Sequence, residues 1–454
     1  MESLIRHILM ASTMAICYLP KVISRIVHHF FHLIGFTLLA LLIGLSSTVY
    51  SQNAVSLKMC HDSAEVKFPV ADQKAKFEQI NQLKQDNLAS KYLPTLNLKA
   101  KATYQSEVVE FKINIPNMNL PAMPKEQYSA NIEINQLIYD GGNIKAAQKV
   151  NEQSSLVNIQ KVEVDIYGLK EQINQLYFNC LLLQENEGIL QLTHETIIEQ
   201  RKMMIAAVNQ GMVLESELDN LSAEMLRLEQ QIIEIKSAKT QVLKALEILS
   251  CFTIDENSEL MPPQIGTDNN ASIFRPEHKL FQNQSQLLDA TIDLTQKKRM
   301  PTLAAFVNGG YGKPGYNYFN DEIHGFYMVG AQFQWNIWDW KQTQREKQQL
   351  SVQKLLIEDN RKAFDKNLTI SLSEAELREQ KLEQLIVKDK AIIELQSRIS
   401  NRSAEQMKNG TKTSADYLRD LNAEKQARIN LESRQIQLIQ SQIDERMIKG
   451  ATLF

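Results

Sequence analysis

The chain has 454 residues and a formal net charge of −3, and 23% of its residues are charged, with acids and bases interspersed. Without a basic excess it lacks the electrostatic footprint of nucleic-acid-binding proteins, so we expect no nucleic-acid partner. Its 11 prolines and 16 glycines are few for this length, which favours long uninterrupted helices over several ordinary globular domains.

The first 51 residues have the pattern of a secretory signal peptide. Lys21 and Arg25 precede an apolar run over 33–45, and a small residue, Ser51, stands at its exit. The run is shorter than the stretch of about 20 apolar residues that a spanning helix needs. We predict cleavage near Ser51-Gln52, with an uncleaved anchor as the alternative.

Cysteine and histidine do not predict a disulfide framework or a metal site. Cys17 lies in the predicted signal peptide, and Cys60, Cys180 and Cys251 are widely spaced. A lipidated amino terminus at Cys60 is an alternative that the preceding Lys58-Met59 disfavours. The scattered histidines lack helical metal-ligand spacing: His61, His194, His278 and His324. No acid/base pair or glycine-rich phosphate loop is visible, so we expect neither a cofactor nor an enzyme.

The mature chain begins with a helical pattern, which is followed by the period-two alternation of strands. Residues 62–92 predict an amphipathic helix that Pro94 ends. Apolar and polar residues then alternate, which predicts strands over 94–105 and 128–138 separated by a proline-containing loop. Asp140-Gly141-Gly142 ends the second strand.

A long helical hairpin follows the two strands. Residues 143–208 contain no proline, and their apolar positions repeat with 4-3 spacing on both sides of a turn at 209–213. Such sustained spacing predicts coiled-coil packing, in helices of which the first is roughly 100 Å long.

The same order of elements then returns. Residues 251–274 show neither helical nor strand periodicity, which predicts a linker between a first copy at 52–250 and a second copy at 275–454. The second copy predicts a helix at 276–299, strands at 302–312 and 326–338, and helices at 341–407 and 413–447 around a tip at 408–412. Pro94-Thr95-Leu96 returns as Pro301-Thr302-Leu303, and Gln210-Gly211 returns as Asn409-Gly410, about 200 residues later.

These segments resemble the TolC family of outer-membrane efflux channels over nearly the whole mature chain. The resemblance rests on the prolines that precede strands, Pro94 and Pro301, on 136–142 at a strand exit, on Arg275-Pro276-Glu277, and on 409–418 as a helical tip. It implies a mainly α fold with β. Four strands from each of three chains would close an outer-membrane β-barrel of twelve strands, continued by a long coiled-coil α-barrel in the periplasm of a Gram-negative bacterium.

The resemblance also implies a function and partners. A homotrimer in outer-membrane lipid would be the passive exit duct of a tripartite efflux or type I secretion system, receiving cargo from an inner-membrane transporter through a periplasmic adaptor protein. Two alternatives are a periplasmic adaptor itself and a purely structural coiled-coil protein. The recurrence of both strand pair and hairpin, and the two-sided strands, argue against them.

The family closes its tunnel at the helix tips, and the resemblance places a periplasmic gate there. Lys412 stands where the family usually has an arginine, Asp416 where it has a gate aspartate, and Glu217 where the first tip has an acid. We expect a Lys412–Glu217 contact between tips and at most one acidic ring, because Arg419 replaces a second aspartate. The alternative, that each is an ordinary solvated charge, stays open. We expect adaptor docking at Gln210, Gly211, Asn409, Gly410, Thr411 and Thr413.

Overall fold

The computed structural model describes residues 54–109, 123–256, 258–264, 275–318 and 320–451. The chain divides into two units, and the second, Val55–Glu256 with Leu260–Phe454, holds every helix and strand described below. All of the first unit except Ala54, Ser258 and Glu259 lies outside the described residues, as does the predicted signal peptide at 1–51.

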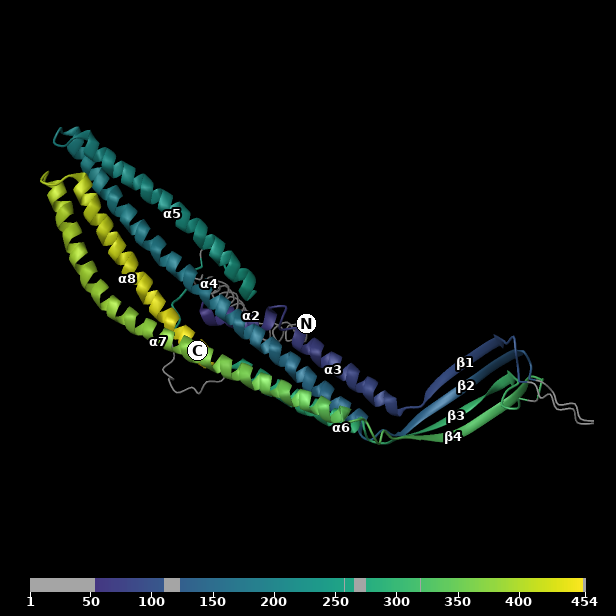
Figure 1. Cartoon of the computed structure of the whole chain (residues 1–454). Coiled ribbons are helices and arrows are strands. Elements are labelled where there is room, and N and C mark those ends of the chain that lie inside the picture. The colour runs from purple at the N-terminus through teal and green to yellow at the C-terminus, as the bar shows by residue number, and fades with distance from the viewer. Residues whose placement is uncertain (1–53, 110–122, 257, 265–274, 319, 452–454) are drawn as a thin grey trace, which may run out of the picture. The chain divides into compact units, whose positions relative to one another are not determined.

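The second unit is built from two sets of elements in the same order (Figure 1). Each set has a helix, two strands, a helix of 67 residues and a helix of 36 residues. The first set comprises α3 (Gln73–Ala89), β1 (Thr95–Tyr104), β2 (Glu126–Tyr139), α4 (Asn143–Asn209) and α5 (Glu215–Ser250). The second comprises α6 (Pro276–Lys297), β3 (Thr302–Lys313), β4 (His324–Gln334), α7 (Gln342–Lys408) and α8 (Ser414–Lys449).

The long helices pack in pairs. Helix α4 lies along α5, and α7 lies along α8, while α4 also contacts α3, α6 and α8 (Figure 1). At 1.5 Å per residue, α4 and α7 are each about 100 Å long. The residues that α7 buries on α8 follow the heptad spacing seen in the sequence, as in Leu368, Ala375 and Leu382.

The prediction of one helix over 62–92 is wrong. The structure has α2 (Leu57–Lys67), a break at 68–72, α3, and a short 3-10 helix, η1 (Ser90–Tyr92). The break contains Pro69, and Phe68 before it is extended with ψ 135°. Proline removes a helical hydrogen bond and disfavours helical geometry in the preceding residue, so the helix ends there.

Helix α2 is held by a core that it shares with α4, α5 and α8. Leu57, Cys60, Ile173 and Leu246 are fully buried in it. The hydroxyl of Tyr177 donates to the carbonyl of Val55 at 2.8 Å. Burial raises the pKa of the Cys60 thiol to about 12. Cys60 is fully buried within α2, which disfavours the lipidation alternative.

The four strands form one antiparallel sheet in the order β1-β2-β3-β4. Strands β2 and β3 join the two sets of elements, with Ala130 opposite Tyr311 and Ile134 opposite Val307. Both faces of the sheet are largely exposed, and β1 and β4 lie at its edges. Strand β4 ends at Gln334, four residues short of the predicted limit of 338. The guanidinium of Arg299 donates to the carbonyl of Ile337 at 3.2 Å and thereby binds the departing segment to the end of α6.

Each sheet-to-helix turn is capped by an aspartate. Asp140 accepts from the N–H groups of Gly142 and Ile144 at 2.9 and 2.6 Å, and Asp339 accepts from those of Lys341 and Thr343 at 3.1 and 3.0 Å. Hydrogen bonds from Thr343 hold the pKa of Asp339 below its usual value. The capped turns satisfy helix N–H groups that would otherwise lack a partner.

The two turns use the same backbone conformation with different residues. Gly141 and Gly142 have φ values of +68° and +81°, whereas Trp340 and Lys341 occupy the corresponding positions with φ values of +52° and +63°. Left-handed conformations cost non-glycine residues roughly 1–2 kcal/mol each. The second turn is therefore strained where the first is not.

We predict that Gly141→Ala lowers the thermal unfolding midpoint more than Gly211→Ala does. Both glycines have positive φ, +68° and +69°. A Cβ at Gly141 would lie 2.3 Å from Cβ of Met300, whereas none of the described atoms lies within 4 Å of one at Gly211. The left-handed strain of roughly 1–2 kcal/mol is common to both, and the clash adds about 1–3 kcal/mol at Gly141 alone. Equal midpoints for the two variants, measured by circular dichroism, would contradict this packing of the first turn against Met300.

Candidate functional site

The two helix tips have the same backbone design. Gly211 and Gly410 both have a φ of +69° and follow the last residues of α4 and α7. In the first tip the N–H of Met212 donates to the carbonyl of Ala207 at 3.0 Å, and in the second the N–H of Thr411 donates to that of Gln406 at 2.9 Å. This is a Schellman ending, in which a left-handed glycine lets the chain reverse and satisfies free helix carbonyls. Both tips thus place the predicted docking residues at sharp, exposed turns.

Thr413 and Asp416 form the beginning of α8. The N–H of Asp416 donates to the hydroxyl of Thr413 at 3.1 Å, and that hydroxyl donates to the Asp416 carboxylate at 2.9 Å. Arg419 reaches the same carboxylate at 3.3 Å. Asp416 is therefore a capping residue with a cation beside it, which reduces the negative charge it can present to a pore.

Within the single chain, Lys412 and Glu217 bind other partners and not each other. The ammonium group of Lys412 instead binds the carboxylate of Asp420 and the hydroxyl of Ser403, and that hydroxyl also donates to Asp420. Sequence reasoning missed Asp420 and Ser403. The available signal was Asp420's position one helical turn after Asp416, which places both acids on one face of α8.

The Lys412–Asp420–Ser403 cluster is largely shielded from water. The side chains of Lys412 and Asp420 are 20% and 14% exposed, and Ser403 lies under them on α7. Burial alone would raise the pKa of Asp420, but the hydrogen bonds from Lys412 and Ser403 outweigh burial and hold that pKa below its usual value. The cluster ties the loop of the second tip to both of its helices.

Glu217 makes a second contact, which joins the two tips. Its carboxylate accepts from the N–H of Ser414, the first residue of α8, at 2.6 Å. The side-chain amide of Asn220 donates to the hydroxyl of the same serine at 3.3 Å. A carboxylate at a helix amino terminus is stabilised by the unpaired N–H groups and the helix dipole. Glu217 therefore fastens the first tip to the start of α8.

A groove of about 440 Å³ lies between the tips. Met204, Met212 and Met407 contribute to its apolar lining, and Glu217, Lys412 and Asp416 to its polar lining. Thioether side chains adapt to irregular partners, so the apolar lining of the groove can change shape beside its charged residues. The sequence-predicted gate residues are thus gathered around one hollow, although two of them bind partners other than those expected.

The remaining predicted residues lie away from the tips. Pro94 and Pro301 directly precede β1 and β3. His194 contacts Glu229, and His278 contacts Asp365. Across the described ranges no group of three His, Cys, Asp or Glu side chains has the geometry to hold a metal ion. In the same part of the chain no helix is both long and apolar enough to cross a membrane.

Comparisons with known proteins find a family similarity over part of the chain and a shared fold. Residues 70–250 match the family model described as outer membrane efflux protein. The structure is similar to the outer membrane protein VceC of Vibrio cholerae, with 12% identity, a TM-score of 0.64, and coverage of 88% of this chain and 97% of that one. No curated protein is matched by the sequence.

Two further solved structures are described as outer membrane channels. The CmeC channel of Campylobacter jejuni has 16% identity and a TM-score of 0.63, covering 87% of this chain and 85% of that one. The open state of the MtrE channel of Neisseria gonorrhoeae has 13% identity and a TM-score of 0.64, covering 87% and 89%. The chain is therefore similar to outer membrane efflux proteins in sequence over 70–250, and it shares the fold of outer membrane channels over most of its length.

Proposed function

We propose that the protein is a passive exit duct in the outer membrane of a Gram-negative bacterium, working as a homotrimer with a periplasmic adaptor and an inner-membrane transporter. One observation supports this most directly: among the described residues, the four-stranded sheet has both faces largely exposed, and no described helix covers either face. In water, such a sheet would expose apolar side chains such as Leu96 and Leu98. In lipid, these side chains have a suitable environment.

The sheet edges support the trimer. Strands β1 and β4 each have one partner strand, so the backbone groups on their outer edges have no ladder partner within the described chain. Lipid does not tolerate such groups, and closure into a barrel removes edges altogether. We propose that β1 of one chain pairs with β4 of the next, so that three chains close the barrel.

An unpaired stripe on α7 supports the same assembly. Besides the residues it buries on α8, α7 carries a second set of apolar side chains that are 44% to 63% exposed in the isolated chain: Ile370, Leu377, Ile392, Leu395 and Ile399. Ile370 and Leu377 are seven residues apart, as are Ile392 and Ile399. A helix with two apolar stripes requires a second partner. We propose that the neighbouring protomer covers this second set and completes a helical tunnel.

We propose that the tips are the gate and the docking site for the adaptor. The Lys412–Asp420–Ser403 cluster and the Glu217–Ser414 contact would hold each protomer's tips in the closed arrangement. Each contributes about 1–3 kcal/mol, as hydrogen bonds to charged groups do. Contacts of this size are weak enough for a bound partner to replace.

The function is tested by fractionation and electrophysiology together. Membranes of cells producing the protein are separated by density, and purified protein is inserted into planar bilayers. We expect recovery in the outer-membrane fraction and discrete channels of uniform conductance. Recovery in the inner-membrane fraction, or a protein that forms no channels, would contradict the proposal and favour an adaptor or a structural coiled coil.

For the trimer, we predict that Leu377→Asp abolishes the heat-sensitive trimer band on gels, because a carboxylate would be buried at the protomer interface. Leu377 is 63% exposed in the single chain, so the same change should leave monomer folding intact. Lys390→Gln, an equal change in charge at an exposed α7 position, serves as the control. A stable Leu377→Asp trimer would exclude this second set from the interface.

For the gate, we predict that Lys412→Gln and Asp420→Asn each raise the open probability of single channels, and that combining them adds little because they break one cluster. Glu217→Gln should raise it too, and its effect should add to that of Lys412→Gln, since their contacts are separate. Lys408→Gln, an exposed lysine of the same tip, is the control. Strong coupling between Lys412 and Glu217 would contradict the prediction that their contacts act separately.

The cluster also predicts a pH dependence. Because the pKa of Asp420 is lower in the folded tip than in an unfolded chain, its stabilisation is complete above the unfolded value of about 3.9 and is lost as pH falls through the folded value. We therefore expect open probability to be constant near neutral pH and to rise in acid. Asp420→Asn should remove that acid-induced rise, and a variant that keeps it would assign the effect to another group.

A further inference from the structure

All three tryptophans of the chain lie within six residues, at Trp335, Trp338 and Trp340. They follow the end of β4 and precede the first residue of α7, Gln342. Their exposed fractions are 52%, 68% and 76%, and the rings of Trp338 and Trp340 meet edge to face at 5.7 Å. Exposed aromatic clusters mark interaction surfaces, and the amphipathic indole prefers the boundary between lipid headgroups and acyl chains.

The backbone at Trp340 indicates that its indole is not needed for the turn. Trp340 adopts a φ of +52°, a conformation that the first set of elements gives to Gly141. The two turns share the same aspartate cap, so glycine performs the structural task without strain. A strained residue at a position where glycine suffices points to a role outside the fold.

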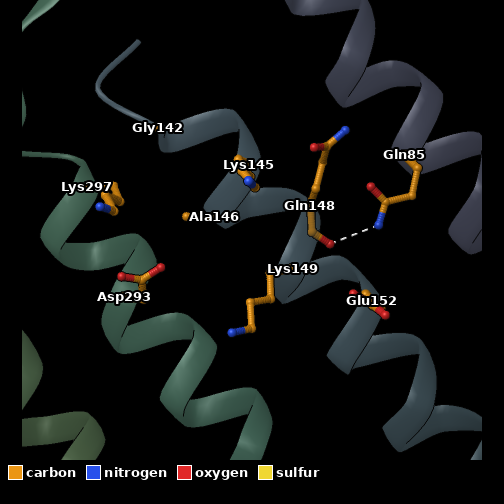
Figure 2. Close-up of a pocket in the computed structure, with 9 residues that line it drawn as sticks. All are labelled: Gln85, Gly142, Lys145, Ala146, Gln148, Lys149, Glu152, Asp293 and Lys297. Atoms are coloured by element: carbon orange, nitrogen blue, oxygen red, sulfur yellow. Dashed lines mark hydrogen bonds between the residues drawn. The ribbon is translucent and has the colours of Figure 1, made fainter.

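Basic side chains lie at the same end of α6. Lys145, Lys149 and Lys297 line a pocket of about 690 Å³ between α3, α4 and α6 (Figure 2). Glu152 and Asp293 also line it, but none of the three lysines makes an ion pair within the described residues. Two residues after Lys297, Arg299 donates to the carbonyl of Ile337 between the tryptophans. The pocket and the tryptophan segment are therefore adjacent.

We propose that this junction, defined as Trp335, Trp338, Trp340 and the three pocket lysines, binds anionic phospholipid. The indoles would lie at the headgroup boundary while the ammonium groups pair with lipid phosphates. A free phosphate ion would use the lysines alone, whereas the neighbouring indoles require the acyl boundary of a bilayer. The proposal rests on the proposed function, because it needs the sheet to lie in the membrane.

Intrinsic fluorescence tests the indoles directly, since the chain has no tryptophan elsewhere. The full-length trimer is placed in nanodiscs of phosphatidylethanolamine and phosphatidylglycerol with bromine at either the upper or the terminal acyl carbons. We expect stronger quenching by bromine at the upper carbons. A water-like emission without quenching would overturn the proposal, as would a blue-shifted emission that neither bromine quenches, which would place the indoles between protomers.

Two sets of variants separate anchoring from folding. Trp340→Gly should keep or raise the thermal midpoint, because it relieves the backbone, yet weaken binding of phosphatidylglycerol, and Trp340→Tyr should restore that binding. The triple variant Lys145→Gln, Lys149→Gln and Lys297→Gln should weaken binding of phosphatidylglycerol, by about fivefold for each lysine. The control triple on α7 is Lys381→Gln, Lys388→Gln and Lys390→Gln, which are exposed and make the same change in charge.

Binding is measured as retained phosphatidylglycerol by native mass spectrometry, with inorganic phosphate as a competitor. Equal loss of phosphatidylglycerol in the pocket triple variant and the control triple variant would overturn the proposal. Displacement of the lipid by inorganic phosphate at the same concentration as the lipid would also overturn it. So would an unchanged lipid content in Trp340→Gly. Channel formation in planar bilayers is recorded for the same samples. A protein that conducts but retains no phosphatidylglycerol refutes only the lipid site, whereas one that does not conduct refutes the exit duct itself.

Discussion

The pairing of β2 with β3 is the interaction on which the arrangement of the chain depends. These strands come from different sets of elements, yet a ladder joins them from Tyr128 opposite Lys313 to Tyr139 opposite Leu303, with one register shift between Leu137 and Tyr139. It converts two hairpins, each marginal alone, into one four-stranded sheet. Because α4 leaves β2 and α6 enters β3 at the same end of this ladder, the pairing also sets α4 against α6.

The turns that leave the sheet show how one structural task is solved with different residues. An aspartate side chain satisfies the first N–H groups of the following helix in both sets, and two residues in left-handed conformation allow the chain to change direction. The first set uses two glycines without strain. The second has strained backbone at Trp340 and Lys341, and the proposed lipid contact of the Trp340 indole gives a reason for the strain at Trp340.

The two helix tips also share one backbone geometry but are stabilised by different side-chain contacts. Both use a left-handed glycine and Schellman hydrogen bonds. In the second tip, Lys412 binds Asp420 of the same tip. In the first tip, Glu217 accepts a hydrogen bond from the N–H of Ser414 at the start of α8. Two separate contacts, each of modest strength, would suit a gate that an external partner opens, because neither contact alone fixes the closed state.

The sequence by itself determined the elements and their order, because period-two alternation, 4-3 spacing and proline positions act locally: β1 and β3 follow Pro94 and Pro301, and the helix tips fall at Gly211 and Gly410. It also contained the break at Pro69, which periodicity alone overlooked. Only the tertiary structure decided that β2 pairs with β3, that Cys60 is buried, and that Lys412 binds Asp420 and not Glu217. Such contacts depend on the distance and orientation of side chains from packed helices, and spacing along one helix does not specify them.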